Sequence, residues 1–152
     1  MPAHVLWVQS MTSDKPNILF IITDHQAFFG HHRPGEFEYV WPRYEKFCGE
    51  GVRFERAYSV SPVCTPARSS MMTGSYPSKH GLMGNSDYGG DFKPNQELYS
   101  HHLARAGYRN AYIGKWHCSH TRLPADYGIE GWSLLDYGKV YMSDAYREYA
   151  RS

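Results

Sequence analysis

Five consecutive apolar residues, from Ile18 to Ile22, lead directly into Thr23 and Asp24. An unbroken apolar run of this length predicts a strand buried on both faces, which is typical of a parallel sheet covered by helices. Open sheets of this kind bind ligands at the carboxyl ends of their strands. Asp24 is therefore a candidate site residue, and the alternative is an aspartate that only caps a turn.

The rest of the chain combines helical and extended patterns. We expect helices at residues 42–50, 65–73, 95–106 and 144–152, and short strands at residues 52–54 and 108–113. Proline near the start and glycine near the end support the first two helices, and Asn95 is the expected N-cap of the third. This order predicts an α/β fold with an at least partly parallel sheet. Residues 1–14 are expected to be a disordered lead-in, and the uncapped last helix suggests a truncated chain.

Composition excludes several classes of function. Sixteen Lys and Arg against fifteen Asp and Glu give a formal net charge of +1, so neither nucleic acid nor an anionic membrane is an expected partner. No apolar run approaches the roughly 20 residues of a membrane span. Residues 1–14 lack the basic start and apolar stretch of a secretory signal, so we expect a cytoplasmic protein. The three cysteines are too widely spaced to indicate a disulfide framework.

The most specific string is CTPARSSMMTG, residues 64–74. Cys64 stands at the start of a predicted helix, where unpaired backbone N–H groups and the helix dipole favour an anion. Arg68 follows one turn later, and its guanidinium can hold a tetrahedral oxyanion with two donors. A nucleophile, a dipole and a guanidinium within one turn predict a phosphate- or sulfate-ester site. Cysteine-dependent phosphatases need a longer spacing than the four positions between Cys64 and Arg68, which excludes that class.

The same string resembles the sulfatase signature C-x-P-x-R-S-x-x-x-T-G and fills every fixed position. Further stretches are similar to family motifs in the same order, at residues 15–24, 49–58, 76–81, 107–117 and 128–132. The resemblance implies an alkaline-phosphatase-like α/β/α sandwich with a mostly parallel sheet. Residues 15–152 would then be the N-terminal part of a sulfatase catalytic domain.

The resemblance also implies a mechanism, that of a sulfuric ester hydrolase. Formylglycine-generating machinery would oxidise Cys64 to formylglycine, whose hydrate attacks the sulfur of a sulfate ester and forms a covalent intermediate. Asp24 and the modified Cys64 would hold a divalent metal, expected to be Ca²⁺, with Mg²⁺ or Mn²⁺ as alternatives. Arg68 would stabilise the hydrated nucleophile, and Lys115 and His117 would bind sulfate oxygens as charge develops.

The substrate implied is a small-molecule or sugar sulfate ester. Asn85 is a further candidate for binding it, because related enzymes often carry a polar residue after the pair that corresponds to His80-Gly81. Lys115 and His117 taken alone would be a solvated pair on one face of a strand end. Cys118 is expected to be a small buried residue.

Two departures from the family pattern alter these expectations. Many sulfatases have two successive aspartates where this chain has Asp24 followed by His25, and Ca²⁺ prefers oxygen ligands. The downstream metal ligands of the family have no counterpart after His117, and one carboxylate binds a hard dication weakly. We therefore expect this chain to be inactive by itself. The alternatives are a phosphonate monoester hydrolase or phosphodiesterase of the same superfamily, and a non-catalytic truncated remnant.

Overall fold

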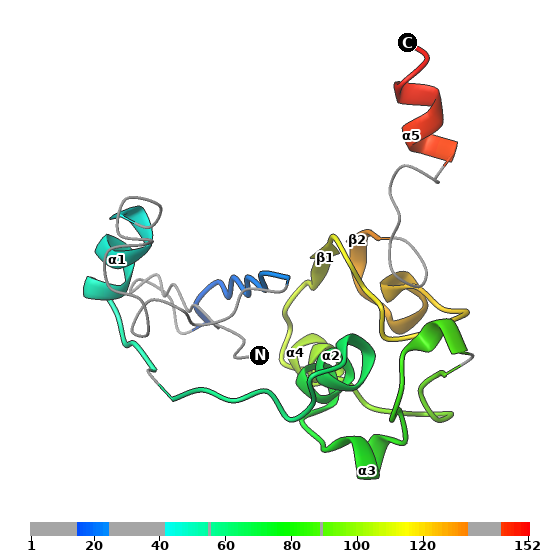
Figure 1. Cartoon of the computed structure of the whole chain (residues 1–152), viewed down its shortest axis with the longest axis horizontal. Coiled ribbons are helices and arrows are strands. Elements are labelled where there is room, and N and C mark those ends of the chain that lie inside the picture. Colours follow the sequence, from blue (N-terminus) through cyan, green and yellow to red (C-terminus); the bar gives the residue numbers. More distant parts are fainter. Residues whose placement is uncertain (1–14, 25–41, 55, 89, 134–143) are drawn as a thin grey trace. The chain divides into compact units, whose positions relative to one another are not determined.

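The computed structural model of the 152-residue chain describes residues 15–24, 42–54, 56–88, 90–133 and 144–152. It divides into two units, Met1–Ser59 and Val60–Ser152, and each is described by itself (Figure 1). Among the residues described, no helix is both long and apolar enough to cross a membrane.

The first unit contains helix α1, Pro42–Gly49. Its start at a proline and its end at a glycine confirm the helix predicted at residues 42–50. Arg53 Nη1 donates to Glu45 Oε2 at 2.8 Å, and this ion pair ties the segment after the helix to the first turn.

Two strands predicted in this unit are not formed, and both predictions were wrong. Residues 18–22 have no regular secondary structure, and Leu19 is 57% exposed. Residues 52–54 are also irregular, and Val52 is 80% exposed. An apolar run forms a strand only where neighbouring strands accept its backbone hydrogen bonds. Within the described ranges, the strands that form lie in the second unit and pair with each other.

The second unit combines a short parallel sheet with several helices (Figure 1). Strands β1, Ala111–Ile113, and β2, Glu130–Trp132, pair in parallel, with Ala111 opposite Glu130 and Ile113 opposite Trp132. Its helices are α2 (Cys64–Thr73), α3 (Pro77–His80), α4 (Tyr99–Arg105) and α5 (Asp144–Tyr149), with 3₁₀ turns η1 (Ser86–Tyr88) and η2 (Pro124–Tyr127). Helix α2 packs on α3 and α4, and β2 packs on η2. This arrangement confirms the α/β class and the parallel pairing.

Helix α2 begins at Cys64, one residue before the predicted start, and ends at Thr73. Gly74 follows with φ of 60°, the left-handed conformation in which a residue without Cβ carries no steric penalty. The predicted glycine cap is therefore confirmed. The helix buries Met72 against the core and leaves Cys64 partly exposed at its N-terminus.

Helix α4 begins four residues after the predicted N-cap, so the boundary at Asn95 was wrong. Asn95 has φ of 60°, which asparagine tolerates better than most residues but which a helix start does not use. The start is instead capped by His101, whose Nδ1 accepts the Leu98 N–H at 3.1 Å.

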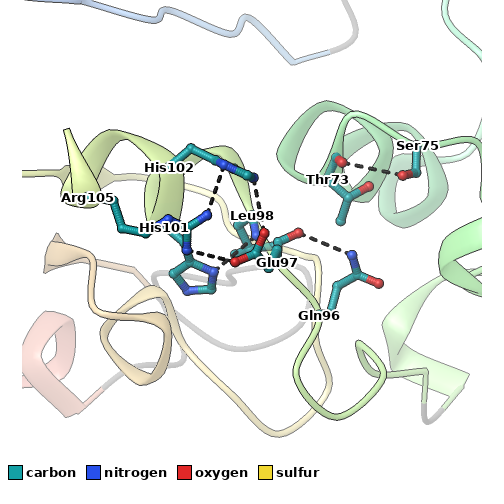
Figure 2. A network of polar contacts seen from close by, with 8 residues as sticks. All are labelled: Thr73, Ser75, Gln96, Glu97, Leu98, His101, His102 and Arg105. Atoms are coloured by element: carbon teal, nitrogen blue, oxygen red, sulfur yellow. Dashed lines mark hydrogen bonds and ion pairs between the residues drawn. The ribbon is translucent and has the colours of Figure 1, made fainter.

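The outer face of α4 carries an exposed polar network, which we call the α4 network: Glu97, His102 and Arg105 (Figure 2). Arg105 Nη1 donates to Glu97 Oε1 at 2.7 Å, and His102 Nε2 lies 3.3 Å from Glu97 Oε2. His102 lies on the helix surface, with its side chain 64% exposed.

The core of the second unit is centred on Trp116, which is fully buried. Aromatic rings surround it: the centroid of Tyr112 lies at 5.2 Å, Tyr127 at 5.8 Å and Phe92 at 6.4 Å. The other buried apolar members are Met72, Leu82, Leu98, Cys118 and Ile129. Cys118 is 1% exposed, which confirms the small buried residue that the sequence predicted, and burial raises the pKa of its thiol to about 12.

Candidate functional site

Cys64 and Lys115 are 51 residues apart in sequence and meet in the second unit. The Nζ atom of Lys115 lies 3.6 Å from the Sγ atom of Cys64, which is the first residue of α2. Cys64 is partly exposed, and its thiol has the positive charge of Lys115 beside it. The structure thus brings together two of the predicted site residues.

Arg68, one helical turn after Cys64, is only 8% exposed. Its Nη1 donates to the carbonyl oxygen of Lys115 at 2.7 Å and to the hydroxyl of Tyr112 at 3.3 Å. The sequence predicted that this guanidinium would act on the nucleophile directly. In the structure it holds the backbone from which the Lys115 side chain extends, and its action on the nucleophile stays a prediction.

Tyr112 is a residue that the sequence analysis missed. Its hydroxyl donates to the Lys115 carbonyl at 2.6 Å, so this one oxygen accepts hydrogen bonds from both Tyr112 and Arg68. Burial raises the pKa of the Tyr112 phenol to about 12, against the opposite effect of the Arg68 charge. The phenol therefore keeps its proton at neutral pH and remains a donor.

The loop from Gly114 to His117 is held by β2 on its other side. The Gly114 N–H donates to the Trp132 carbonyl at 3.1 Å, and Ser133 Oγ donates to the Gly114 carbonyl at 2.7 Å. Gly114 and His117 have φ of 109° and 50°, so the chain turns instead of continuing the strand.

The predicted alternation at residues 115–117 is therefore wrong. β1 ends at Ile113, residues 115–117 are not in a strand, and both Trp116 and His117 are fully buried. His117 is not part of a solvated pair. Its predicted contact with sulfate oxygens stays a prediction.

Asn85 lies outside helix α2 and accepts a hydrogen bond from its first turn. Its Oδ1 accepts the backbone N–H of Thr65 at 3.3 Å, and Thr65 Oγ1 accepts the N–H of Ser86 at 2.9 Å. Pro66 has no N–H, so residues 65 and 66 offer an anion fewer donors than the sequence suggested. The positive charge beside Cys64 comes from Lys115 together with the helix dipole.

A buried pair joins α2 to α3. His80 Nδ1 accepts the Leu82 N–H at 3.1 Å, so its Nε2 carries the proton and donates to Ser70 Oγ at 3.0 Å. Burial is the main cause that lowers the pKa of His80, and the Lys93 charge adds to it. The imidazole is thus neutral at neutral pH and acts as a structural link.

The predicted metal site, which pairs Asp24 with Cys64, is not tested by the structure and stays a prediction. Asp24 belongs to the first unit, whereas Cys64 belongs to the second. Within the described ranges, no three His, Cys, Asp or Glu side chains form a group that could hold a metal ion. His25, His31 and His32 lie outside the described residues.

Comparisons with known proteins bear on this site. A family model described as Sulfatase matches residues 16–151. An ulvan-active sulfatase of Formosa agariphila is 36% identical over 137 residues, which cover 83% of this chain and 26% of that protein. An N-acetylglucosamine-6-O-sulfatase of Bacteroides thetaiotaomicron is 30% identical over 138 residues, covering 91% of this chain and 23% of that protein.

A choline-sulfatase of Rhizobium meliloti is 36% identical over 108 residues, which cover 70% of this chain and 20% of that protein. The chain thus spans between a fifth and about a quarter of the length of these curated relatives.

Proposed function

The chain belongs to the sulfatase family, and from that premise we propose that it forms the part of a sulfuric ester hydrolase that carries the nucleophile. The family implies an alkaline-phosphatase-like fold, with which the parallel β1–β2 pair and its helices are consistent. We further propose that these elements form one part of an α/β/α sandwich.

The observation that carries the proposal is the meeting of Cys64 with Lys115. An ammonium group 3.6 Å from Sγ places a positive charge where an anionic sulfate ester would approach the nucleophile. A buried arginine one turn along the same helix supports the lysine backbone. Both residues lie within the segment that matches the family.

The chemistry proposed depends on modification of Cys64. Sulfatases generally use a formylglycine made from a cysteine, together with a divalent metal. The hydrated aldehyde supplies one hydroxyl as the nucleophile and a second whose return to the aldehyde releases sulfate. A plain cysteine or serine offers no second hydroxyl for that release.

The side chains of this region have distinct roles in the proposal. Lys115 binds the sulfate oxygens and offsets the charge that grows on them during attack. Arg68 stabilises the hydrated nucleophile and holds the Lys115 backbone, and His117 binds a further sulfate oxygen. Asn85 accepts a hydrogen bond from the first turn of α2, and we assign it a substrate contact in addition.

The proposal includes a divalent metal and assigns residues that would bind it. Asp24 and the modified Cys64 are the donors that we assign to it, with Ca²⁺ as the expected ion. Because the described residues do not gather a full set of donors, we derive no step through the metal. We also propose that the 152 residues by themselves do not turn over substrate, because the downstream metal ligands that the family implies have no counterpart after His117.

We propose a small-molecule or sugar sulfate ester as the substrate. The relatives named above include sulfatases named for ulvan, for N-acetylglucosamine and for choline. Their names support the class of sulfated sugars and small alcohols for this chain without selecting one member of it.

Peptide mass spectrometry of the chain from its natural host tests the proposal. The tryptic segment from Ala57 to Arg68 contains Cys64 and no other cysteine. We expect an aldehyde in place of the thiol in this segment. The segment from Phe47 to Arg53 contains Cys48 and serves as the matched control, in which the thiol stays unchanged. An unmodified Cys64 throughout would contradict the proposed function.

A further inference from the structure

We propose that Tyr112 is a positioning residue, whose hydroxyl fixes the backbone of Lys115 so that the lysine ammonium stays beside Cys64. The inference rests on the proposed function, since it assigns Lys115 to the site of the nucleophile. Tyr112 itself touches neither Cys64 nor a reacting atom in this proposal, and it acts through Lys115.

The first argument is the convergence of donors on one oxygen. Lys115 O accepts from Tyr112 Oη at 2.6 Å and from Arg68 Nη1 at 2.7 Å, and the two donors lie 3.3 Å apart. Arg68 comes from α2 and Tyr112 from β1, so two elements meet at this carbonyl. A carbonyl with two donors is held in one orientation more firmly than a carbonyl with one.

The second argument is that Tyr112 is itself held. Its strand pairs with β2, and its ring packs edge-on against Trp116, at 5.2 Å between centroids and 85° between planes. Its hydroxyl therefore has a defined place from which to donate. The phenol also keeps its proton at neutral pH, as described above.

The third argument concerns the lysine. A lysine ammonium is a point charge on a flexible four-carbon stem, so its position depends on where the backbone directs the stem. Gly114, the residue before Lys115, has φ of 109°, a conformation that leaves the loop dependent on its hydrogen bonds. Loss of the Tyr112 hydroxyl would let the Lys115 backbone shift and the ammonium spend less time near Cys64.

Alkylation of Cys64 reports whether the Lys115 ammonium lies beside the thiolate. Iodoacetate is an anion and iodoacetamide is neutral, and both react with the same thiolate. The ratio of their rate constants therefore cancels the thiolate fraction and reports the local charge. We would measure it on the 152-residue chain made with Cys64 as a thiol, following the segment Ala57 to Arg68 by mass spectrometry.

We expect Lys115→Met to lower the ratio about fivefold, the factor for a unit charge at about 4 Å in water. Tyr112→Phe should lower it about twofold, because the charge remains but is less well placed. Tyr112→Phe should have no further effect in the Lys115→Met background. Tyr127→Phe is the matched control, since this ring also packs on Trp116 and its hydroxyl makes no hydrogen bond to Lys115 among the described residues.

An unchanged ratio in a folded Tyr112→Phe chain would overturn the inference, and so would an unchanged ratio in Lys115→Met. Near-ultraviolet circular dichroism shows whether Tyr112→Phe folds. If it does not, we would measure the alkylation ratio in chains with 4-aminophenylalanine or 4-methylphenylalanine at position 112. These side chains share one shape, and only the first has a donor. Equal ratios for the two would overturn the inference, and a higher ratio for the amino form would support it. Modification of Cys64 in the natural host is measured separately, so failure of the proposed function is distinguished from failure of this inference.

Discussion

Two polar networks of the second unit differ in burial more than in chemistry. Each contains an arginine, and each arginine makes a hydrogen bond of 2.7 Å. Arg68 is 8% exposed, and its guanidinium donates to the carbonyl oxygen of Lys115. Arg105 in the α4 network has a side chain that is 56% exposed and binds a carboxylate on the same surface.

The difference shows which contacts determine the structure. A buried donor that loses its partner cannot turn to water, whereas an exposed one can. We therefore expect truncation of a side chain that binds the Lys115 carbonyl to lower the free energy of unfolding clearly. Truncation of a side chain in the α4 network should leave it nearly unchanged, although that network contains ion pairs.

The largest expected effect comes from Arg68→Met. It removes a buried, charged donor from the Lys115 carbonyl, and we expect the free energy of unfolding to fall by about 2–3 kcal/mol. Urea denaturation monitored by circular dichroism measures this. Arg105→Met is the matched control, and equal losses in the two variants would show that burial does not separate the networks.

Tyr112→Phe tests the same network with a smaller change. The ring and its contact with Trp116 stay, and one hydrogen bond to the Lys115 carbonyl is lost. We expect the free energy of unfolding to fall by about 1 kcal/mol. Tyr76→Phe provides the control, because Tyr76 is 69% exposed and should be neutral. A loss as large in Tyr76→Phe would contradict the comparison.

The buried His80 extends the comparison to pH. Its pKa in the folded state lies below the ordinary value of 6.5, so folding favours the neutral ring. The unfolded chain binds the proton first as pH falls, and stability therefore decreases below about pH 6.5 until the folded pKa is passed. Urea midpoints between pH 8 and pH 5 measure this decrease. The slope should be reduced in His80→Gln, and an unchanged slope there would assign it to other groups.

Glu97→Gln should have the smallest effect. The hydrogen bond from Arg105 lowers the pKa of Glu97, but both groups are exposed and screened by salt. We expect no measurable change in the urea midpoint at 0.15 M salt. A clear loss of stability would mean that the α4 network is worth more than its exposure indicates.

The part of the site whose residues are close in sequence was predictable. Cys64 and Arg68 lie four positions apart on a helix whose end at Gly74 could be read from the chain. The role of Tyr112 was not predictable. It depends on the Lys115 carbonyl, which Arg68 also binds although the two residues are 47 positions apart in the sequence. The capping role of Asn85 was also missed, because its partner Thr65 is 20 residues away.

The sequence by itself determined the helices α1, α2 and α5, the family signature, and the place of Cys64 at the start of α2. Those features depend on residues within one or two turns of each other, where proline, glycine and helical spacing act directly. Tertiary structure alone decided that residues 18–22 form no strand, that His101 caps α4, and that Lys115 meets Cys64. Strands, side-chain caps and convergent sites require partners distant in sequence, and only the folded backbone brings those partners within hydrogen-bonding distance.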